Sequence, residues 1–239
     1  RRVKVEQEFV YPMLGGRNIE KWRVKSFEFM LIPHDLDNLY GIQEEDLARR
    51  APKTLSYLKI YEKPLFDSRV QNGKFFNPDI QPFYRLDNIG SYTYARYKDL
   101  WKEQTKNFAS VAVDSFNNTL PDVKDVYFDY DRPFVIDSKV LMLECSSMQE
   151  AYYVSGILNS PVISSIIDGY AISTNRGVDV LQNIRIPQFD ETNSIHVQIS
   201  KISHELHRDR QNQISNDKII EQMENSLDPL VLSLFSIEV

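Results

Sequence analysis

The sequence predicts an α+β protein in which short strands come first and helices come last. Three observations support this fold class. Residues 23–33 alternate polar and apolar side chains, as a half-buried strand does. Short apolar runs separated by Asn, Asp and Pro occupy residues 108–145, and after residue 146 apolar residues recur at helical spacing. Strands followed by helices are typical of the α+β class, here with a mixed or antiparallel sheet.

The first half contains the strand signals and one helix signal. In the strand expected at 23–33, Phe27, Phe29 and Leu31 share one side. A short helix is expected to start at Pro52 and to end before Pro64. Residues 71–91 mix Gly, Asn and Pro with aromatic residues, which predicts an ordered loop because aromatic rings must pack. The remaining short strands are expected at 108–113, 126–130, 134–136 and 140–145.

The second half contains capped helices. A capping box at residues 147–150 predicts a helix through Leu158, and Ser160 with Pro161 predicts the start of another. A short apolar run at 184–187 follows, closed by proline. Asn193 or Ser194 caps an amphipathic helix, and two more helices are expected at about 217–227 and 229–235. We therefore divide the chain into residues 1–145, a mainly β and loop part, and residues 146–239, a helical part packed on it.

Composition indicates a globular chain in a reducing compartment. The 239 residues are 42% hydrophobic, which is enough for a core. No run approaches the roughly 18 apolar residues of a membrane span, and residues 1–10 lack an apolar signal core. Cys145 is the one cysteine, so an internal disulfide is impossible. We expect a cytoplasmic protein without a membrane partner, and a chain cut from something longer.

The charge is distributed unevenly along the chain. The net charge of −6 argues against a polyanionic partner. Residues 49–106, however, hold twelve basic and six acidic residues, a surplus of six positive charges, so the rest of the chain carries −12. The same window holds eleven aromatic residues. Basic residues interleaved with aromatic ones suit nucleic-acid binding, although many of these rings must be core. On residues alone, nucleic-acid binding and protein interaction stay equally open.

Motifs for independent catalysis are weak. Gly15-Gly16 is not part of a nucleotide-binding glycine motif and favours a turn. His204 and His207 are three residues apart, whereas the zinc-protease motif needs four. The aspartates at 122, 125, 129 and 131 match no calcium loop. We expect this chain alone to be non-catalytic and to hold no metal; an independent hydrolase using these groups is the weakest alternative.

Several sequence segments, taken in their order along the chain, resemble those of one protein family. They are "YPMLGGRNIEKW", "LIPHD", "APKTLSYLKIYEKPLFDSR", "FYRLDNIGSYTYARYKDLWK", "FASVAV", "YYVSGILNSPV" and "LQNIRIPQFDETNSIHVQISKISHELH". Together, from about residue 5 to 208, they are similar to the C-terminal target-recognition region of bacterial and archaeal N6-adenine DNA methyltransferases, including type IIG restriction–modification enzymes. In such proteins "GRNIEKW" opens the recognition region, an aromatic "Y-K-x-x-W" strand follows, and an "I-L-N-S" helix leads to an "I-x-I-P" strand end.

The resemblance implies that catalysis and DNA recognition lie in different domains. A preceding methyltransferase domain, in cis or in trans, would bind S-adenosylmethionine and flip an adenine, while this chain would read double-stranded DNA and hold no cofactor itself. Arg176, in a polar loop tip, would suit a guanine contact, although an ordinary turn is equally open. The implied DNA-contacting residues, chosen by charge and position, are Arg17, Arg49, Arg50, Lys53, Lys74, Arg85, Arg96, Lys98, Lys102, Lys106 and Arg176.

Two other functions remain open beside this one. The chain could be a free-standing specificity subunit like those of type I restriction–modification systems, which assemble with separate methyltransferase chains. It could also be a protein–protein interaction domain with no role at DNA. If the chain is a recognition domain or a specificity subunit, the parent assembly methylates DNA site-specifically, and this chain supplies the sequence recognition.

Overall fold

The computed structural model describes residues 3–35, 40–72, 76–116, 131–170, 177 and 184–235. It divides the chain into two compact units. The first unit comprises Arg1–Pro12 and Phe29–Tyr94, and the second comprises Met13–Glu28 and Ala95–Val239. The boundary expected at residue 145 lies inside the second unit, where the strands before it and the helices after it pack together.

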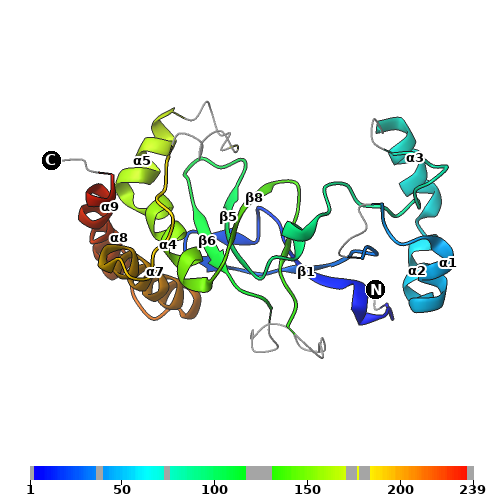
Figure 1. The fold of residues 1–239 in the computed structure, drawn as a ribbon, viewed down its shortest axis with the longest axis horizontal. Coiled ribbons are helices and arrows are strands. Elements are labelled where there is room, and N and C mark those ends of the chain that lie inside the picture. Colours follow the sequence, from blue (N-terminus) through cyan, green and yellow to red (C-terminus); the bar gives the residue numbers. More distant parts are fainter. Residues whose placement is uncertain are drawn as a thin grey trace. The chain divides into compact units, whose positions relative to one another are not determined.

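The first unit combines short extended segments with three helices (Figure 1). In chain order its elements are a 3-10 helix at Gln7–Phe9, β1 (Val10–Leu14), β4 (Glu28–Leu31), α1 (Glu44–Arg50), α2 (Pro52–Lys59), α3 (Glu62–Asn72) and a 3-10 helix at Ser91–Tyr94. β4 and β1 are neighbours in a three-stranded sheet of order β4-β1-β7. Both β1 and β4 continue across the boundary between the units.

The sequence anticipated the middle helix of this unit but missed its neighbours. α2 starts at Pro52 and ends at Lys59, as expected. α3 contains Pro64, which lies in its first turn, where a helix needs no amide hydrogen. α1 has a single buried residue, Leu47, so its apolar periodicity is weak; acidic residues in its first turn and arginines in its last complement the helix dipole.

The core of the first unit lies between these helices and the loop after residue 76. Tyr84 packs edge-on against Phe83 and donates its hydroxyl to the carbonyl of Ile42. The loop from residue 76 is therefore ordered by its aromatic residues, as predicted, whereas residues 71 and 72 belong to α3 and residues 73–75 lie outside the described residues. The buried residues of this core are Phe9, Ile42, Leu47, Ala51, Leu55, Leu58, Phe83 and Tyr84.

The second unit is built on an antiparallel sheet of order β6-β5-β8. Its strands are β5 (Tyr97–Lys102), β6 (Ser110–Val113) and β8 (Val140–Cys145), with Leu100 opposite both Val111 and Met142. A small hairpin pairs β2 (Ile19–Glu20) with β3 (Arg23–Val24). β7 (Val135–Ile136) pairs in parallel with the end of β1.

Several strand predictions are confirmed and two need correction. The strands expected at 108–113, 134–136 and 140–145 correspond to β6, β7 and β8. The single strand expected at 23–33 is instead β3 and β4 with a break at 25–27, because the amide of Lys25 turns back to the carbonyl of Asn18. No strand forms at 184–187. The strand expected at 126–130 lies outside the described residues.

Of the described helices in the second unit, three begin at the predicted caps, the fourth begins at Asp217 as expected, and the last begins at Leu227, two residues before its expected start. These helices are α4 (Met148–Asn159), α5 (Pro161–Tyr170), α7 (Ser194–Asn212), α8 (Asp217–Asn225) and α9 (Leu227–Leu234). The hydroxyl of Ser147 accepts from the amide of Glu150 at 3.1 Å, and the side chain of Asn193 accepts from the amide of Ile195 at 2.9 Å. None of the helices in the described ranges has the length and hydropathy needed to cross a bilayer.

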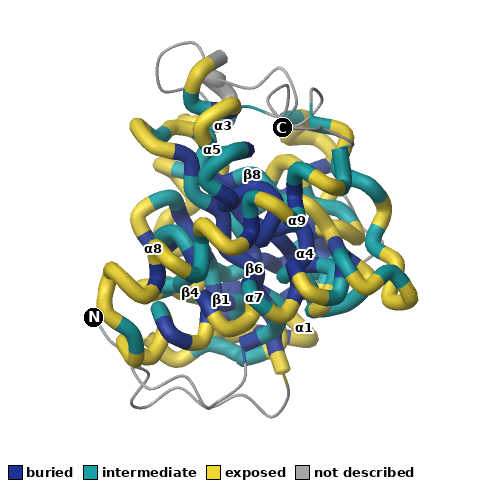
Figure 2. The backbone as a smooth tube through the Cα atoms, turned by 90° about the vertical axis from the view of Figure 1, so that its left-hand side faces the viewer, coloured by how far each residue is buried: buried dark blue, intermediate teal, exposed yellow. Residues whose placement is uncertain are grey.

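α4 forms the centre of the second unit. It packs on β5 and β6 and against α7, and Figures 1 and 2 show these elements gathered around it, with dark buried segments at α4 and β6. Gly156 permits the close approach of α4 to α7, since a Cβ there would lie 2.7 Å from Ile199. The buried core includes Trp22, Trp101, Phe108, Tyr153, Ile157, Ile199, Leu206, Ile220, Leu227 and Val231. The α+β class is confirmed.

Candidate nucleic-acid interface

Gly15-Gly16 forms the start of a tight turn in the second unit. The amide of Asn18 donates to the carbonyl of Gly15 at 2.9 Å, and the amide of Gly15 donates to the side chain of Asn18 at 2.7 Å. Asn18 also donates to the hydroxyl of Ser26 at 2.9 Å. A Cβ on Gly15 would meet the carboxylate of Asp137. The two glycines therefore form a turn, as expected, and this turn leads into the β2–β3 hairpin.

Trp22 anchors the tip of that hairpin. Its side chain is fully buried, although its φ of 68° is unusual for a bulky residue. Its indole Nε1 donates to Oε1 of Glu224 on α8 at 2.6 Å, and its amide donates to the carbonyl of Ser110 at 3.3 Å. His207 on α7 packs edge-on against the ring. The neighbours of Trp22 in the hairpin therefore have defined positions.

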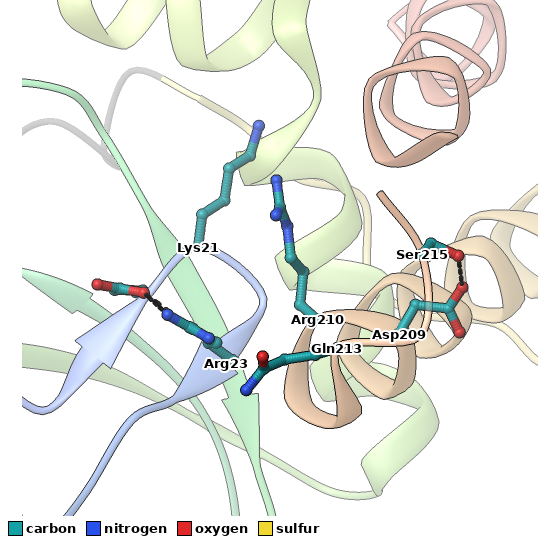
Figure 3. A pocket seen from close by; sticks show the side chains of 7 residues that line it. Lys21, Arg23, Asp209, Arg210, Gln213 and Ser215 are labelled. Carbon is teal, nitrogen blue, oxygen red and sulfur yellow. Dashed lines mark hydrogen bonds and ion pairs between the residues drawn. The ribbon is translucent and has the colours of Figure 1, made fainter. Parts of the chain in front are cut away.

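A polar pocket lies between this hairpin and the C-terminal end of α7 (Figure 3). Its volume is about 520 Å³. Lys21 and Arg23 reach it from the hairpin, and Arg210 reaches it from α7. The other lining residues are Glu20, Asp209, Gln213 and Ser215.

Four of the predicted cations that the structure describes lie in the first unit. Arg49 and Arg50 end α1, and Lys53 follows in the first turn of α2, so these three are close in the chain. Arg49 pairs with Asp46 but its side chain is 79% exposed, and Lys53 is exposed. Arg50 is held by two carboxylates, those of Glu8 and Asp35, which raise the pKa of its guanidinium.

Arg85 stands apart from that group. Its side chain is 13% exposed, it pairs with Asp87 at 3.1 Å, and it lies over the ring of Tyr40. A guanidinium in this position supports the loop after residue 76. Lys74 lies outside the described residues.

Four predicted cations of the second unit are accessible. Arg17 in the tight turn is 74% exposed and pairs with Glu28. Arg96 is exposed and pairs with Asp114 at 2.8 Å, which raises its pKa. Lys102 at the end of β5 is partly exposed, and Lys106 is exposed. Arg176 lies outside the described residues.

The position of Lys98 contradicts its predicted role. Although it was expected to contact DNA, its side chain is fully buried. Its ammonium donates to the carbonyls of Ala95 and Phe134, the latter at 2.7 Å. Burial lowers the pKa of Lys98 to about 8. A buried ammonium bonded to the main chain serves the fold and cannot reach a phosphate.

The histidines have structural partners in the second unit. His207 is buried; its Nε2 accepts from the amide of Ala112 at 2.9 Å, and its Nδ1 lies 2.7 Å from the carbonyl of Ser203. Burial lowers the pKa of His207 to about 4. His204 packs against the ring of Tyr152. Among the described residues, no three His, Cys, Asp or Glu side chains are placed to hold a metal ion; Asp122, Asp125 and Asp129 lie outside that part of the chain.

The cations of the polar pocket were missed at the level of sequence. Lys21, Arg23 and Arg210 lie outside the basic window at 49–106, and the short basic run at 17–25, with four basic residues and one acidic one, was not recognised as a signal. The hairpin and α7 meet through tertiary contacts such as the hydrogen bond from the amide of Val24 to Gln211. A weak indication of the pocket was the polar run "RDRQNQ" at 208–213, which follows the end of the apolar stripe of α7.

Comparison with known proteins identifies a similar fold. No protein-family model matches the chain, and no curated protein matches it. A solved structure of the type IIL restriction-modification enzyme MmeI in complex with DNA is similar, with a TM-score of 0.54 and 11% sequence identity. The match covers 98% of this chain and 29% of that chain. The chain thus has a fold related to part of a restriction-modification enzyme, and it spans less than a third of that enzyme's length.

Proposed function

We propose that this chain is the DNA sequence-recognition domain of an adenine-specific DNA methyltransferase or restriction–modification enzyme. The observation that carries the proposal is the fold likeness, which extends over 98% of the chain to a restriction-modification enzyme solved with DNA. The order of sequence phrases from "YPMLGGRNIEKW" to "HELH" supports the same function independently of the fold. The chain would bind duplex DNA and position it for a methyltransferase domain in cis or in trans.

The accessible cations supply the DNA contacts in this proposal. Arg49 and Lys53 would contact phosphates from the first unit. Arg17, Arg96, Lys102 and Lys106 would do so from the second unit. Lysine and arginine contacts of this kind position a protein on the duplex without reading its sequence. S-adenosylmethionine would be bound by the partner domain, which would also carry the catalytic groups.

Affinity for duplex DNA and its salt dependence test the proposal directly. We expect the 239-residue chain to bind a 30-base-pair duplex with a dissociation constant of about 10⁻⁴ to 10⁻⁶ M, the range of non-specific binding, with affinity falling as salt rises. Replacing Lys102 and Lys106 with glutamine should weaken binding and reduce the salt slope by about 0.9 for each lost contact. Lys218→Gln, an exposed change on α8, is the matched control.

The opposite result would favour a different class of protein. If fluorescence anisotropy detects no DNA binding at low salt, the chain is better explained as a protein-interaction domain. The coding sequence upstream of residue 1 separates the two forms of the proposal. A continuous frame with a methyltransferase motif indicates a domain in cis, whereas a nearby start codon indicates a free-standing specificity subunit.

A further inference from the structure

The polar pocket between the β2–β3 hairpin and α7 presents three cations to one space. Lys21 and Arg210 point in the same direction in Figure 3, and Arg23 lies below them beside Gln213. A lysine ammonium and two guanidinium groups offer several N–H donors to a bound anion, and the amide of Gln213 can add another. The donor set suits an oxyanion with several acceptor oxygens.

The carboxylates of the pocket are already engaged. Glu20 bonds Arg23 at 2.6 Å through one oxygen and Lys25 at 3.1 Å through the other. Asp209 accepts from the guanidinium of Arg208 and from the hydroxyl of Ser215, and the hydroxyl bond is the main cause that lowers the pKa of Asp209. Both carboxylates therefore bind cations or hydroxyl groups of the protein.

The remaining ion pairs leave one positive charge in surplus. Lys21 pairs with Glu224 at 2.9 Å, and Arg210 pairs with Asp217 at 2.6 Å. The side chain of Asp217 is 90% exposed, so solvent weakens its pair with Arg210. Across the pocket and these pairs, five cations face four carboxylates: Lys21, Arg23, Lys25, Arg208 and Arg210 against Glu20, Asp209, Asp217 and Glu224.

The backbone at this pocket is unusual as well. Two of the three non-glycine residues with positive φ in the described part of the chain are found here, Trp22 at 68° and Gln213 at 54°. Trp22 lies between Lys21 and Arg23, and Gln213 lines the pocket itself. The conformation of Gln213 is the left-handed C-cap that ends α7, whereas that of Trp22 costs about 1 kcal/mol or more and is held by tertiary contacts. The buried Trp22 fixes the hairpin so that Lys21 and Arg23 are held in place.

We propose that this pocket binds a phosphate group, with Lys21, Arg23 and Arg210 as its cationic contacts. A phosphodiester carries a single negative charge, which matches the surplus positive charge of the pocket. Guanidinium groups bind two phosphate oxygens at once, which gives direction as well as affinity. The source of the phosphate is the backbone of duplex DNA, a step that rests on the proposed function.

Titration with inorganic phosphate tests the pocket without DNA. The indole signal of Trp22 in a ¹H–¹⁵N spectrum is the readout, because its Nε1 bonds the same Glu224 that pairs with Lys21. Trp101→Phe assigns the second indole signal. We expect a saturable shift with phosphate and none with sodium chloride at equal ionic strength. Arg210→Gln and Lys21→Gln should each weaken phosphate binding about tenfold.

Matched changes away from the pocket serve as controls. Lys201→Gln on α7 and Arg185→Gln alter exposed cations that do not line it, and they should leave phosphate binding within about twofold. A shift that fails to saturate, or that persists unchanged in both pocket variants, overturns the phosphate pocket. If a pocket variant unfolds, the other variant and the chloride control still decide the question.

Titration with a 20-base-pair duplex tests the source of the phosphate. Arg210→Gln should make the negative slope of log K against log salt shallower by about 0.9, whereas Lys201→Gln should leave it unchanged. If the chain binds DNA and Arg210→Gln has the control's slope, the assignment of the pocket to DNA is wrong and the proposed function stands. If phosphate binds and DNA does not, the pocket stands and the proposed function is wrong.

Discussion

The indole Nε1 of Trp22 donates a 2.6 Å hydrogen bond to Oε1 of Glu224, a residue 202 positions later in the chain. The other carboxylate oxygen of Glu224 pairs with Lys21 at 2.9 Å. One carboxylate on α8 therefore holds two consecutive residues of the β2–β3 hairpin. The relationship joins the segment that opens the second unit to the helices that end it, and it determines how the polar pocket is built.

Loss of the Glu224 carboxylate should loosen the hairpin. Glu224→Ala leaves a buried indole N–H without its acceptor, so we expect the free energy of unfolding to fall by about 1 to 3 kcal/mol. Urea unfolding followed by fluorescence measures the change. Glu221→Ala, an exposed position on the same helix, is the control and should change stability by less than about 0.5 kcal/mol. Equal stability of the two variants would contradict the role of Glu224.

A buried carboxyl group in the sheet should make stability depend on pH. Asp99 is fully buried; one oxygen accepts from Ser110 at 2.8 Å, and the other has no partner in the described structure. Burial raises the pKa of Asp99 to about 8, against hydrogen bonds from Ser110 and Ser155 that lower it. The folded state thus keeps a proton that the unfolded state releases above about pH 4.

Stability should therefore fall as pH rises through the window from about 4 to about 8. The cleanest part is pH 6.5 to 7.5. His207, whose pKa is lowered, acts in the opposite sense below about 6.5, and Lys98, whose pKa is lowered to about 8, does so above about 7.5. The slope there should approach, at most, about 1.4 kcal/mol per pH unit. Asp99→Asn should remove this slope in urea unfolding at pH 6.5, 7 and 7.5. A wild-type protein with flat stability across this window would contradict the prediction.

The contact between α4 and α7 should not tolerate a side chain at Gly156. A Cβ would lie 2.7 Å from Cγ2 of Ile199 and 3.2 Å from Cβ of Ser203. Gly156→Ala should therefore lower the free energy of unfolding by about 1 to 3 kcal/mol through overpacking. Gly169→Ala on α5 is the control, since nothing lies within 4 Å of its Cβ, and it should be neutral or stabilising by up to about 1 kcal/mol. Thermal or urea unfolding of both variants decides the matter.

Two lysines on one strand should behave differently. Lys98→Gln should lower stability, because the carbonyls of Ala95 and Phe134 lose a buried ammonium donor. Lys102→Gln should leave stability within about 0.5 kcal/mol and weaken duplex binding. Parallel unfolding and anisotropy measurements separate the two effects. A stable Lys98→Gln variant with reduced DNA affinity would show that Lys98 contacts DNA after all.

Much of the local structure was predictable because its signals are short in range. The caps at Ser147 and Asn193, the prolines that open α2 and α5, and the turn at Gly15 are confirmed. α1 was missed because its face has one buried residue, Leu47. The strand expected at 23–33 was wrong in extent, because alternation continues through a break where the amide of Lys25 bonds the carbonyl of Asn18.

The site was less predictable than the fold, and Lys98 and Arg210 show why. Lys98 stands in a basic, aromatic window, where charge alone favours exposure, yet the sheet buries it beside main-chain carbonyls. Arg210 follows one basic and one acidic residue, so local charge predicts nothing, yet it faces the hairpin residues Lys21 and Arg23 across one pocket. Exposure and long-range pairing depend on packing, which residue type does not specify.

By itself the sequence determined the α+β class, the caps and turns, and the resemblance to a DNA recognition region, because each rests on neighbouring residues or on their order. The tertiary structure alone decided which cations are exposed, where the compact units divide, and that Glu224 holds Trp22 and Lys21. Those properties arise from contacts between residues up to 202 positions apart, whose pairing is set by the packing of the core.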